Sequence, residues 1–119
     1  EGVTMYLDAE AVDETLALIH ASAAKASLLA FDAIYGSVLR RENRYAGEKE
    51  VFERVARAGE GWTFGVDEGA MPGFLAERGF EIVAFYTASD LEKAYLTAED
   101  GSLHGHVNGT HCLVVAKTV

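Results

Sequence analysis

The spacing of apolar and polar residues along the chain predicts helices and strands in alternation. Apolar residues recur at helical spacing over about 9–24, and Asp8 stands where its carboxylate can accept N–H groups of the first helical turn. The stretch 27–35 is almost continuously apolar, as is typical of a strand buried on both faces of a parallel sheet. Two more strands are predicted over 80–87 and 110–117. This pattern indicates a layered α/β domain.

Helices and connecting segments are predicted between these strands. Residues 37–58 carry helical signals that are broken or weakened at Gly47. Ser89 to Glu92 has the form of a capping box, in which the first and last residues bind each other's backbone N–H groups at a helix start. The other segments are a short extended piece, a short helix and a polar loop, over 62–65, 70–78 and 97–109.

The order of these elements predicts one α/β domain over residues 1–119, with a mainly parallel sheet. The chain contains no internal repeat and no linker-like segment. Only two or three of the predicted strands are long, which is few for an independent sheet of this type. The apolar run that starts directly after Glu1 looks like the middle of a strand-to-helix pattern. We therefore expect the chain to form the C-terminal segment of a larger domain.

The composition is that of a folded, acidic domain. Half of the 119 residues are apolar and only one is proline, which excludes a disordered or collagen-like chain. The formal net charge of −9 disfavours binding to a phosphate backbone, so no nucleic-acid partner is predicted. No apolar run approaches the roughly 20 residues of a membrane helix, so no membrane partner is predicted either. Cys112 is the only cysteine and cannot form an internal disulfide, which favours a reducing, cytoplasmic setting.

His104, His106, His111 and Cys112 form an H-x-H-x4-H-C pattern of metal-binding residue types. On an extended segment the first two imidazoles would share one face, and zinc accepts both nitrogen and sulfur ligands. The spacing differs from the close ligand pairs of structural zinc sites, and a thiol inside an apolar strand is ordinarily a core residue. No metal site is therefore predicted, and burial would also make Cys112 a poor nucleophile.

The segment Glu1–Asp8 carries the most informative chemistry. The segment places an acid at the end of an apolar strand, followed by a glycine and a short turn with an aromatic hydroxyl. Together they would form the rim of a ligand-binding site, in which Glu1 accepts hydrogen bonds and Tyr6 donates one. The alternative is a simple turn in which Tyr6 packs on the sheet edge. Asp32 also has two interpretations: it faces a pocket beyond the end of its strand, or it caps or hydrogen-bonds the following turn.

The sequence EGVTMYLD resembles the E-G-x-x-x-Y-L element of the leucine carboxyl methyltransferase family of S-adenosylmethionine-dependent O-methyltransferases. The resemblance continues through LLAFDAIYG, WTFGVDE, FLAERGFEIV and HCLVVAK, and covers nearly all 119 residues as the C-terminal portion of that family. Ala26-Ser27 departs from it, because the family often has Gly-Ser there, and this departure affects only a turn.

The resemblance implies a Rossmann-like class I methyltransferase sheet, mostly parallel, whose last strand runs antiparallel beside its neighbour. It implies S-adenosylmethionine as the methyl donor, with Glu1 lining the cofactor site and Tyr6 beside the acceptor pocket. Asp32, Tyr35 and Trp62 are assigned to the wall of that pocket only from their positions beyond strand ends. The family's glycine-rich cofactor loop is expected N-terminal to Glu1, so the isolated chain is expected to lack activity and measurable cofactor binding.

The function expected of the parent protein is transfer of a methyl group to an oxygen, that of a carboxylate on a small molecule or a peptide end. A carboxylate is already ionised at pH 7 and needs no strong base, which agrees with the lack of an evident catalytic His or Lys. No catalytic residue is therefore assigned. The alternative is a non-catalytic α/β module that binds proteins or forms a homo-oligomer through an exposed sheet edge.

Overall fold

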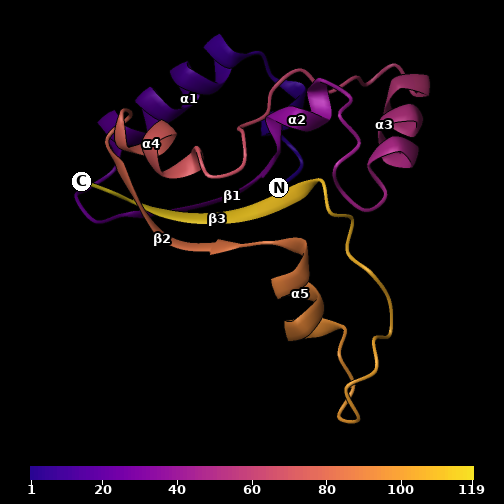
Figure 1. Ribbon diagram of the computed structural model, residues 1–119. Helices are drawn as coiled ribbons and strands as arrows, with labels where there is room; N and C mark the ends of the chain where they lie inside the picture. The colour runs from indigo at the N-terminus through magenta and orange to yellow at the C-terminus, as the bar shows by residue number, and fades with distance from the viewer.

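Three strands form the single sheet of the molecule, in the order β1-β3-β2 (Figure 1). They are β1 (Leu28–Ile34), β2 (Phe80–Tyr86) and β3 (His111–Thr118), in a computed structural model that describes residues 1–119. The last strand, β3, is central and pairs antiparallel with both neighbours. The α/β class and the antiparallel last strand are thus confirmed, whereas the predicted mostly parallel pairing is not found: both strand pairs are antiparallel.

The prediction of a mostly parallel sheet was wrong because the order of elements along the chain indicates the direction of each strand. It does not indicate which strands lie side by side in the sheet. β1 and β2 are joined through helices and run in the same direction, as alternation of helices and strands predicts. They do not pair with each other, because β3 returns through the helix-free segment 96–110 and lies between them. An apolar run indicates burial and carries no information on the direction of the neighbouring strand.

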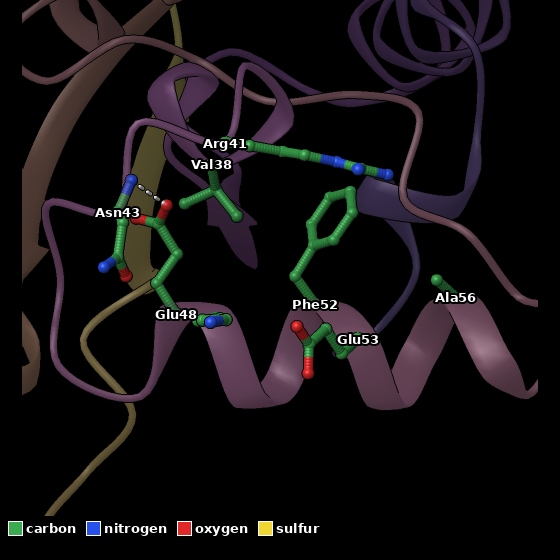
Figure 2. Close-up of a pocket in the computed structure, with 8 residues that line it drawn as sticks. Val38, Arg41, Asn43, Glu48, Phe52, Glu53 and Ala56 are labelled. Atoms are coloured by element: carbon green, nitrogen blue, oxygen red, sulfur yellow. Dashed lines mark hydrogen bonds between the residues drawn. The ribbon is translucent and has the colours of Figure 1, made fainter.

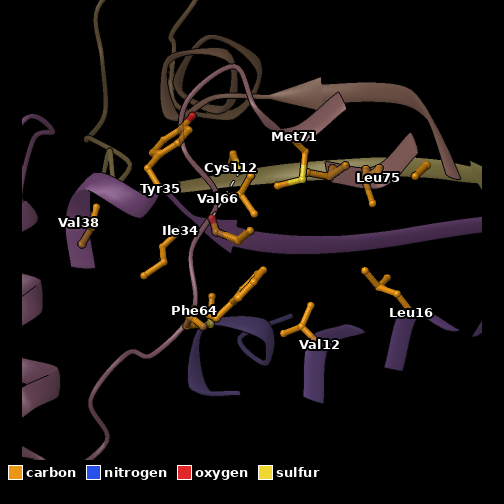
Figure 3. Packing of buried hydrophobic residues seen from close by; sticks show 14 of the residues in the cluster. Val12, Leu16, Ile34, Tyr35, Val38, Phe64, Val66, Met71, Leu75 and Cys112 are labelled. Atoms are coloured by element: carbon orange, nitrogen blue, oxygen red, sulfur yellow. Dashed lines mark hydrogen bonds between the residues drawn. The ribbon is translucent and has the colours of Figure 1, made fainter. Parts of the chain in front are cut away.

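Helices cover mainly one face of the sheet. α1 and α4 lie over this face, whereas α5 lies on the opposite side near one end (Figure 1). Alternate residues of β3 are buried, and the hydrophobic core around them is shown in Figure 3. The residues between them, such as Leu113 and Val115, are only half-buried. The helical elements around the sheet are η1 (Thr4–Tyr6), α1 (Ala9–Ser22), α4 (Met71–Ala76) and α5 (Ala88–Tyr95).

Carboxylates form the start of two helices. Asp8 accepts the N–H of Ala11 at 2.8 Å before α1, as predicted. α5 begins with a capping box formed by Thr87 and Asp90, two residues before the one predicted at Ser89. Thr87 takes this role because it has extended backbone angles directly after β2, as the residue before a helix requires. The resulting helices are short, and none has both the length and the apolar content needed to cross a bilayer.

The region 37–58, predicted as helical with a break or weakening at Gly47, forms two helices, α2 (Gly36–Leu39) and α3 (Glu48–Arg57). Gly47, directly before α3, has a φ of +75°, which explains why the helical signal weakens there. Arg41 has a φ of +56°, also in the left-handed region. The chain therefore leaves α2 through a sharply bent loop.

The outer edge of β1, opposite β3, is covered over only half of its length. The Thr4 hydroxyl donates to the backbone oxygen of Asp32 at 2.7 Å, and the Val66 N–H donates to the backbone oxygen of Ile34 at 3.0 Å. Residues Leu28–Ala30 have no hydrogen-bond partner on this edge. One end of the strand is thus enclosed, and the other is open.

Candidate functional site

Hydrogen bonds hold the N-terminal turn at the C-terminal end of β1. The Gly2 N–H donates to Asp32 Oδ1 at 2.8 Å, and the Thr4 hydroxyl donates to the Asp32 backbone oxygen. Met5 of η1 is 1% exposed and anchors the turn in the core. Gly2 has a φ of +64°, which favours glycine at this position. The turn that carries Glu1 is therefore held beside the C-terminal end of β1.

A second set of hydrogen bonds ties the same turn to the segment that follows α3. The Thr63 N–H donates to the Met5 backbone oxygen at 2.7 Å, and the Thr63 hydroxyl donates to the Leu7 backbone oxygen at 2.7 Å. Tyr6 lies between these two acceptors in the sequence and is 42% exposed. It lines a shallow hollow of about 460 Å³ together with residues 59–61. The Tyr6 hydroxyl is thus available to a ligand on this side of the turn.

Trp62 belongs to the extended segment 62–65, which joins no strand. Its ring meets the rings of Phe52 and His111 edge-on, at centroid distances of 6.5 Å and 5.3 Å. The indole N–H is buried and has no hydrogen-bond partner. Trp62 therefore packs between α3 and the start of β3, and it does not line the hollow beside Tyr6.

His111, at the start of β3, is a neutral, packed imidazole near pH 7. Burial lowers its pKa below the usual value, and the nearby negative charge of Asp32 opposes this effect only in part. Its Nδ1 lies 2.8 Å from the hydroxyl of Thr110, which is fully buried. His111 thus supports the ring of Trp62 and is not exposed as a base.

Tyr35 packs against the loop between α2 and α3. Its ring stacks on that of Tyr45, with centroids 4.5 Å apart and an angle of 19° between the planes. Burial raises the pKa of the Tyr35 hydroxyl, so the phenol stays protonated. No hydrogen bond or ring contact joins Tyr35 to the N-terminal turn. The structure therefore does not bring Tyr35 together with Glu1 and Tyr6.

The predicted site residues thus fall into two groups. Glu1 and Tyr6 lie on the turn whose Gly2 and Thr4 bind Asp32 near the end of β1. Tyr35 and Trp62 lie in the neighbouring core. Asp32 is 8% exposed, and its Oδ1 accepts the N–H of Gly2, which precedes β1. It therefore fastens a turn, but this is the N-terminal turn and not the following turn of the prediction.

Sequence reasoning missed two kinds of feature. The hydroxyls of Thr4 and Thr63 donate to backbone oxygens that are distant in sequence, which no local pattern reveals. It also missed a cavity of about 330 Å³ between α2 and α3, where Arg41 and Phe52 lie close together (Figure 2). A run of charged residues usually indicates solvated surface, so the arginines of this region gave no signal.

The histidines and the cysteine of the H-x-H-x4-H-C pattern are not brought together. His106 Nδ1 lies 3.3 Å from Glu92 Oε1 at the surface, and His104 is exposed. Cys112 is buried in β3, where burial raises the pKa of its thiol to about 11. No group of three or more His, Cys, Asp or Glu side chains lies close enough to hold a metal ion.

No protein-family model matches the chain, and no curated protein matches it. The chemistry of the site is therefore argued from its geometry. Glu1 offers an exposed carboxylate and Tyr6 an exposed phenol, and the turn that carries both is fixed to a strand end by Asp32. Such an arrangement can bind and orient a ligand through hydrogen bonds.

Proposed function

We propose that this chain is the C-terminal part of an S-adenosylmethionine-dependent O-methyltransferase of the leucine carboxyl methyltransferase type, which methylates a carboxylate on a small molecule or a peptide end. The observation that carries the proposal is the 2.8 Å hydrogen bond from Gly2 to Asp32. It joins the E-G-x-x-x-Y-L element to a strand end of the kind that binds ligands in α/β sheets. The antiparallel pairing of β3 with β1 also supports the proposal, because the resemblance implies an antiparallel last strand.

The residues of the turn fit one edge of a cofactor site. Glu1 is exposed, and its carboxylate can accept hydrogen bonds from hydroxyl or amino groups of a ligand. A Cβ built on Gly2 would meet no atom within 4 Å, so the space beside the turn is open. The 119 residues contain no glycine-rich loop between a strand and a helix. We therefore assign the remaining cofactor contacts to residues outside this chain.

When bound, S-adenosylmethionine supplies a methyl group, which passes from its sulfonium sulfur to a carboxylate oxygen as the C–S bond breaks. The acceptor carboxylate is ionised near pH 7, so no residue has to remove a proton. This agrees with the packed, neutral state of His111 and the protonated state of Tyr35. In this proposal Glu1 orients the cofactor and Tyr6 donates a hydrogen bond to the acceptor, so the protein acts by positioning.

The coding sequence that precedes Glu1 tests the proposal. We expect it to encode a G-x-G-x-G loop after a strand, and we expect the full-length protein to transfer labelled methyl groups from S-adenosylmethionine to carboxylates. Glu1→Gln should lower kcat/KM for the cofactor by about tenfold or more, since it removes a charged hydrogen-bond acceptor. Glu10→Gln, an exposed change in the first turn of α1, is the matched control and should have no effect. A full-length protein without the loop, or without methyl transfer to any carboxylate, would contradict the proposal.

The isolated chain gives a second test. With one edge of the cofactor site present, we expect S-adenosylmethionine to bind more weakly than about micromolar in a calorimetric titration. Micromolar binding by the 119 residues alone would show that the cofactor site is not divided as proposed.

A second candidate function, association through the outer edge of β1, is favoured by one observation. Residues Leu28–Ala30 have no partner on this edge, and Leu28 is 69% exposed. An unpaired edge with apolar side chains readily pairs with another strand. Sedimentation of the chain at several concentrations tests this, because Leu28→Lys should shift a self-associated chain towards the monomer. A chain that sediments as a monomer throughout would remove this candidate.

A further inference from the structure

The cavity between α2 and α3 is separate from the N-terminal turn. It has a volume of about 330 Å³ and shares no lining residue with the hollow beside Tyr6. In Figure 2 the Phe52 side chain rises from α3 towards the side chain of Arg41, which extends across it. Apolar and charged groups thus line one cavity.

Glu48 gives the loop above this cavity its shape. Its side chain is buried, and its carboxylate accepts the N–H of Asn43 at 2.5 Å and that of Arg44 at 3.1 Å. Arg41 and Asn43 have φ values of +56° and +52°. A left-handed arginine is uncommon, and such residues persist only where the surroundings hold them. The bent loop directs the Arg41 side chain across the cavity.

Arg41 has no anionic partner within the chain. Its guanidinium carbon lies 4.7 Å from the centroid of the Phe52 ring, whereas no carboxylate oxygen lies within 4.0 Å of its nitrogens. Its neighbours differ, because Arg40 and Arg44 pair with Glu42 at 3.3 Å and 2.9 Å. In a chain with a net charge of −9, this guanidinium is left with its planar fork of N–H donors unused.

The charges that face the cavity favour a ligand with a single negative charge. They are carried by Arg41, Lys49, Glu48 and Glu53. Two backbone N–H groups bind the Glu48 carboxylate, and the Arg57 guanidinium lies 3.4 Å from the Glu53 carboxylate, but both acids still oppose an incoming anion. Their repulsion is larger for a phosphate dianion than for a carboxylate. A carboxylate also matches the two parallel N–H bonds that an arginine fork offers.

The rest of the wall favours an apolar body on that ligand. Val38, Phe52 and Ala56 line the cavity beside the charged groups. Phe52 presents a ring against which a flat apolar group can pack.

We propose that the cavity between α2 and α3 binds a small organic monocarboxylate, whose carboxylate is held by Arg41 and whose apolar body packs on Phe52 and Ala56. This inference goes beyond the proposed methyltransferase function and does not depend on it. It names a ligand class for a part of the molecule to which neither Glu1 nor Tyr6 contributes.

Titration with 3-phenylpropionate, followed by nuclear magnetic resonance of the isotope-labelled chain, tests the proposal. We expect saturable shifts at the residues that line the cavity, with a Kd of about 1 mM or tighter. Arg41→Met keeps an unbranched apolar side chain over Phe52 but removes the fork, and it should weaken binding by about tenfold or more. Arg44→Met removes a guanidinium of the same loop that is paired with Glu42, and it should leave the Kd within about twofold.

Two further ligands separate the charge from the apolar body. 3-Phenylpropionamide has the same shape without the charge and should not saturate at the same concentrations. Phenyl phosphate should bind more weakly than the carboxylate, because Glu48 and Glu53 both oppose its second charge. Dispersed spectra of both variants, unchanged away from the cavity, show that each remains folded.

Several results would overturn the proposal. They are equal binding of the amide, tighter binding of phenyl phosphate, unchanged binding in Arg41→Met, shifts centred outside the cavity, and no saturation up to about 20 mM.

Discussion

The two halves of β1 have similar apolar sequences and opposite surroundings. In the first half Leu28 is 69% exposed, and the outer edge of the strand has no partner. In the second half Ala33 and Ile34 are fully buried, and Thr4 and Val66 cover the edge. The difference teaches that an apolar run alone does not decide burial. Residues far away in the sequence decide it, by covering one end of the strand and leaving the other open.

The largest expected effect comes from shortening one side chain in each half. Ile34→Ala should lower the free energy of unfolding by about 3 kcal/mol, because it leaves a cavity in the packed core. Leu28→Ala should lower it by less than about 0.5 kcal/mol, since its side chain is already exposed. Urea denaturation of both variants measures the difference. Equal losses would show that the open half of the strand is covered in solution.

Substitutions of Asp32 test whether its carboxylate holds the N-terminal turn over the covered half of β1. Asp32→Ala leaves the Gly2 N–H without its acceptor and should lower the free energy of unfolding by about 1–2 kcal/mol. Asp32→Asn keeps an acceptor oxygen and should cost less than the alanine variant. Hydrogen exchange at the Gly2 amide, together with urea denaturation, measures both effects. If the alanine variant were as stable as the parent chain, the turn would not depend on this carboxylate.

The turn that leads into the open half gives a smaller, stabilising effect. Ala26 has a φ of +66°, in the left-handed region that favours glycine. Ala26→Gly should therefore raise the free energy of unfolding by about 0.5–1 kcal/mol, since relief of this strain exceeds the added flexibility of the unfolded chain. Ala30→Gly, at an exposed position inside β1, is the control and should lower stability by a similar amount. A loss of stability in Ala26→Gly would contradict the strain argument.

This position also shows what a sequence resemblance can locate. The leucine carboxyl methyltransferase resemblance marked Ala26 as a departure from glycine, and the structure has positive φ at that residue. The carboxylate before α1 and the positions of the three strands were likewise predicted, because they depend on local spacing and propensity. The interruption of the 37–58 helical region at Gly47 was predicted as well, but the non-helical loop over 40–46 was not, because there the Glu48 carboxylate accepts the backbone N–H groups of Asn43 and Arg44.

The candidate site was predicted only as far as its residues are close in sequence. Glu1 and Tyr6 lie on one short turn, so their proximity follows from the sequence itself. The Gly2 to Asp32 bond and the Thr63 bonds join segments about 30 and 58 residues apart, and no periodicity encodes such pairs. The prediction of strand pairing was wrong for the same reason, because β3 lies between two strands that precede it in the chain.

His111, paired with Ile34 across the covered end of the sheet, gives the smallest of these effects and is visible only as a dependence on pH. Burial lowers its folded-state pKa below the usual value near 6.5, so the unfolded chain takes up the proton first as the pH falls. The contribution of His111 to stability is therefore fully present above about pH 6.5 and is lost as the pH falls through the lower, folded-state pKa. Urea denaturation at about pH 7.5 and pH 5.5 should show a smaller acid-induced loss in His111→Gln than in the parent chain, whereas exposed His104→Gln should not change that loss. A ring titration by nuclear magnetic resonance in which the pKa of His111 is not lowered from its usual value near 6.5 would place His111 outside the enclosed end of β1.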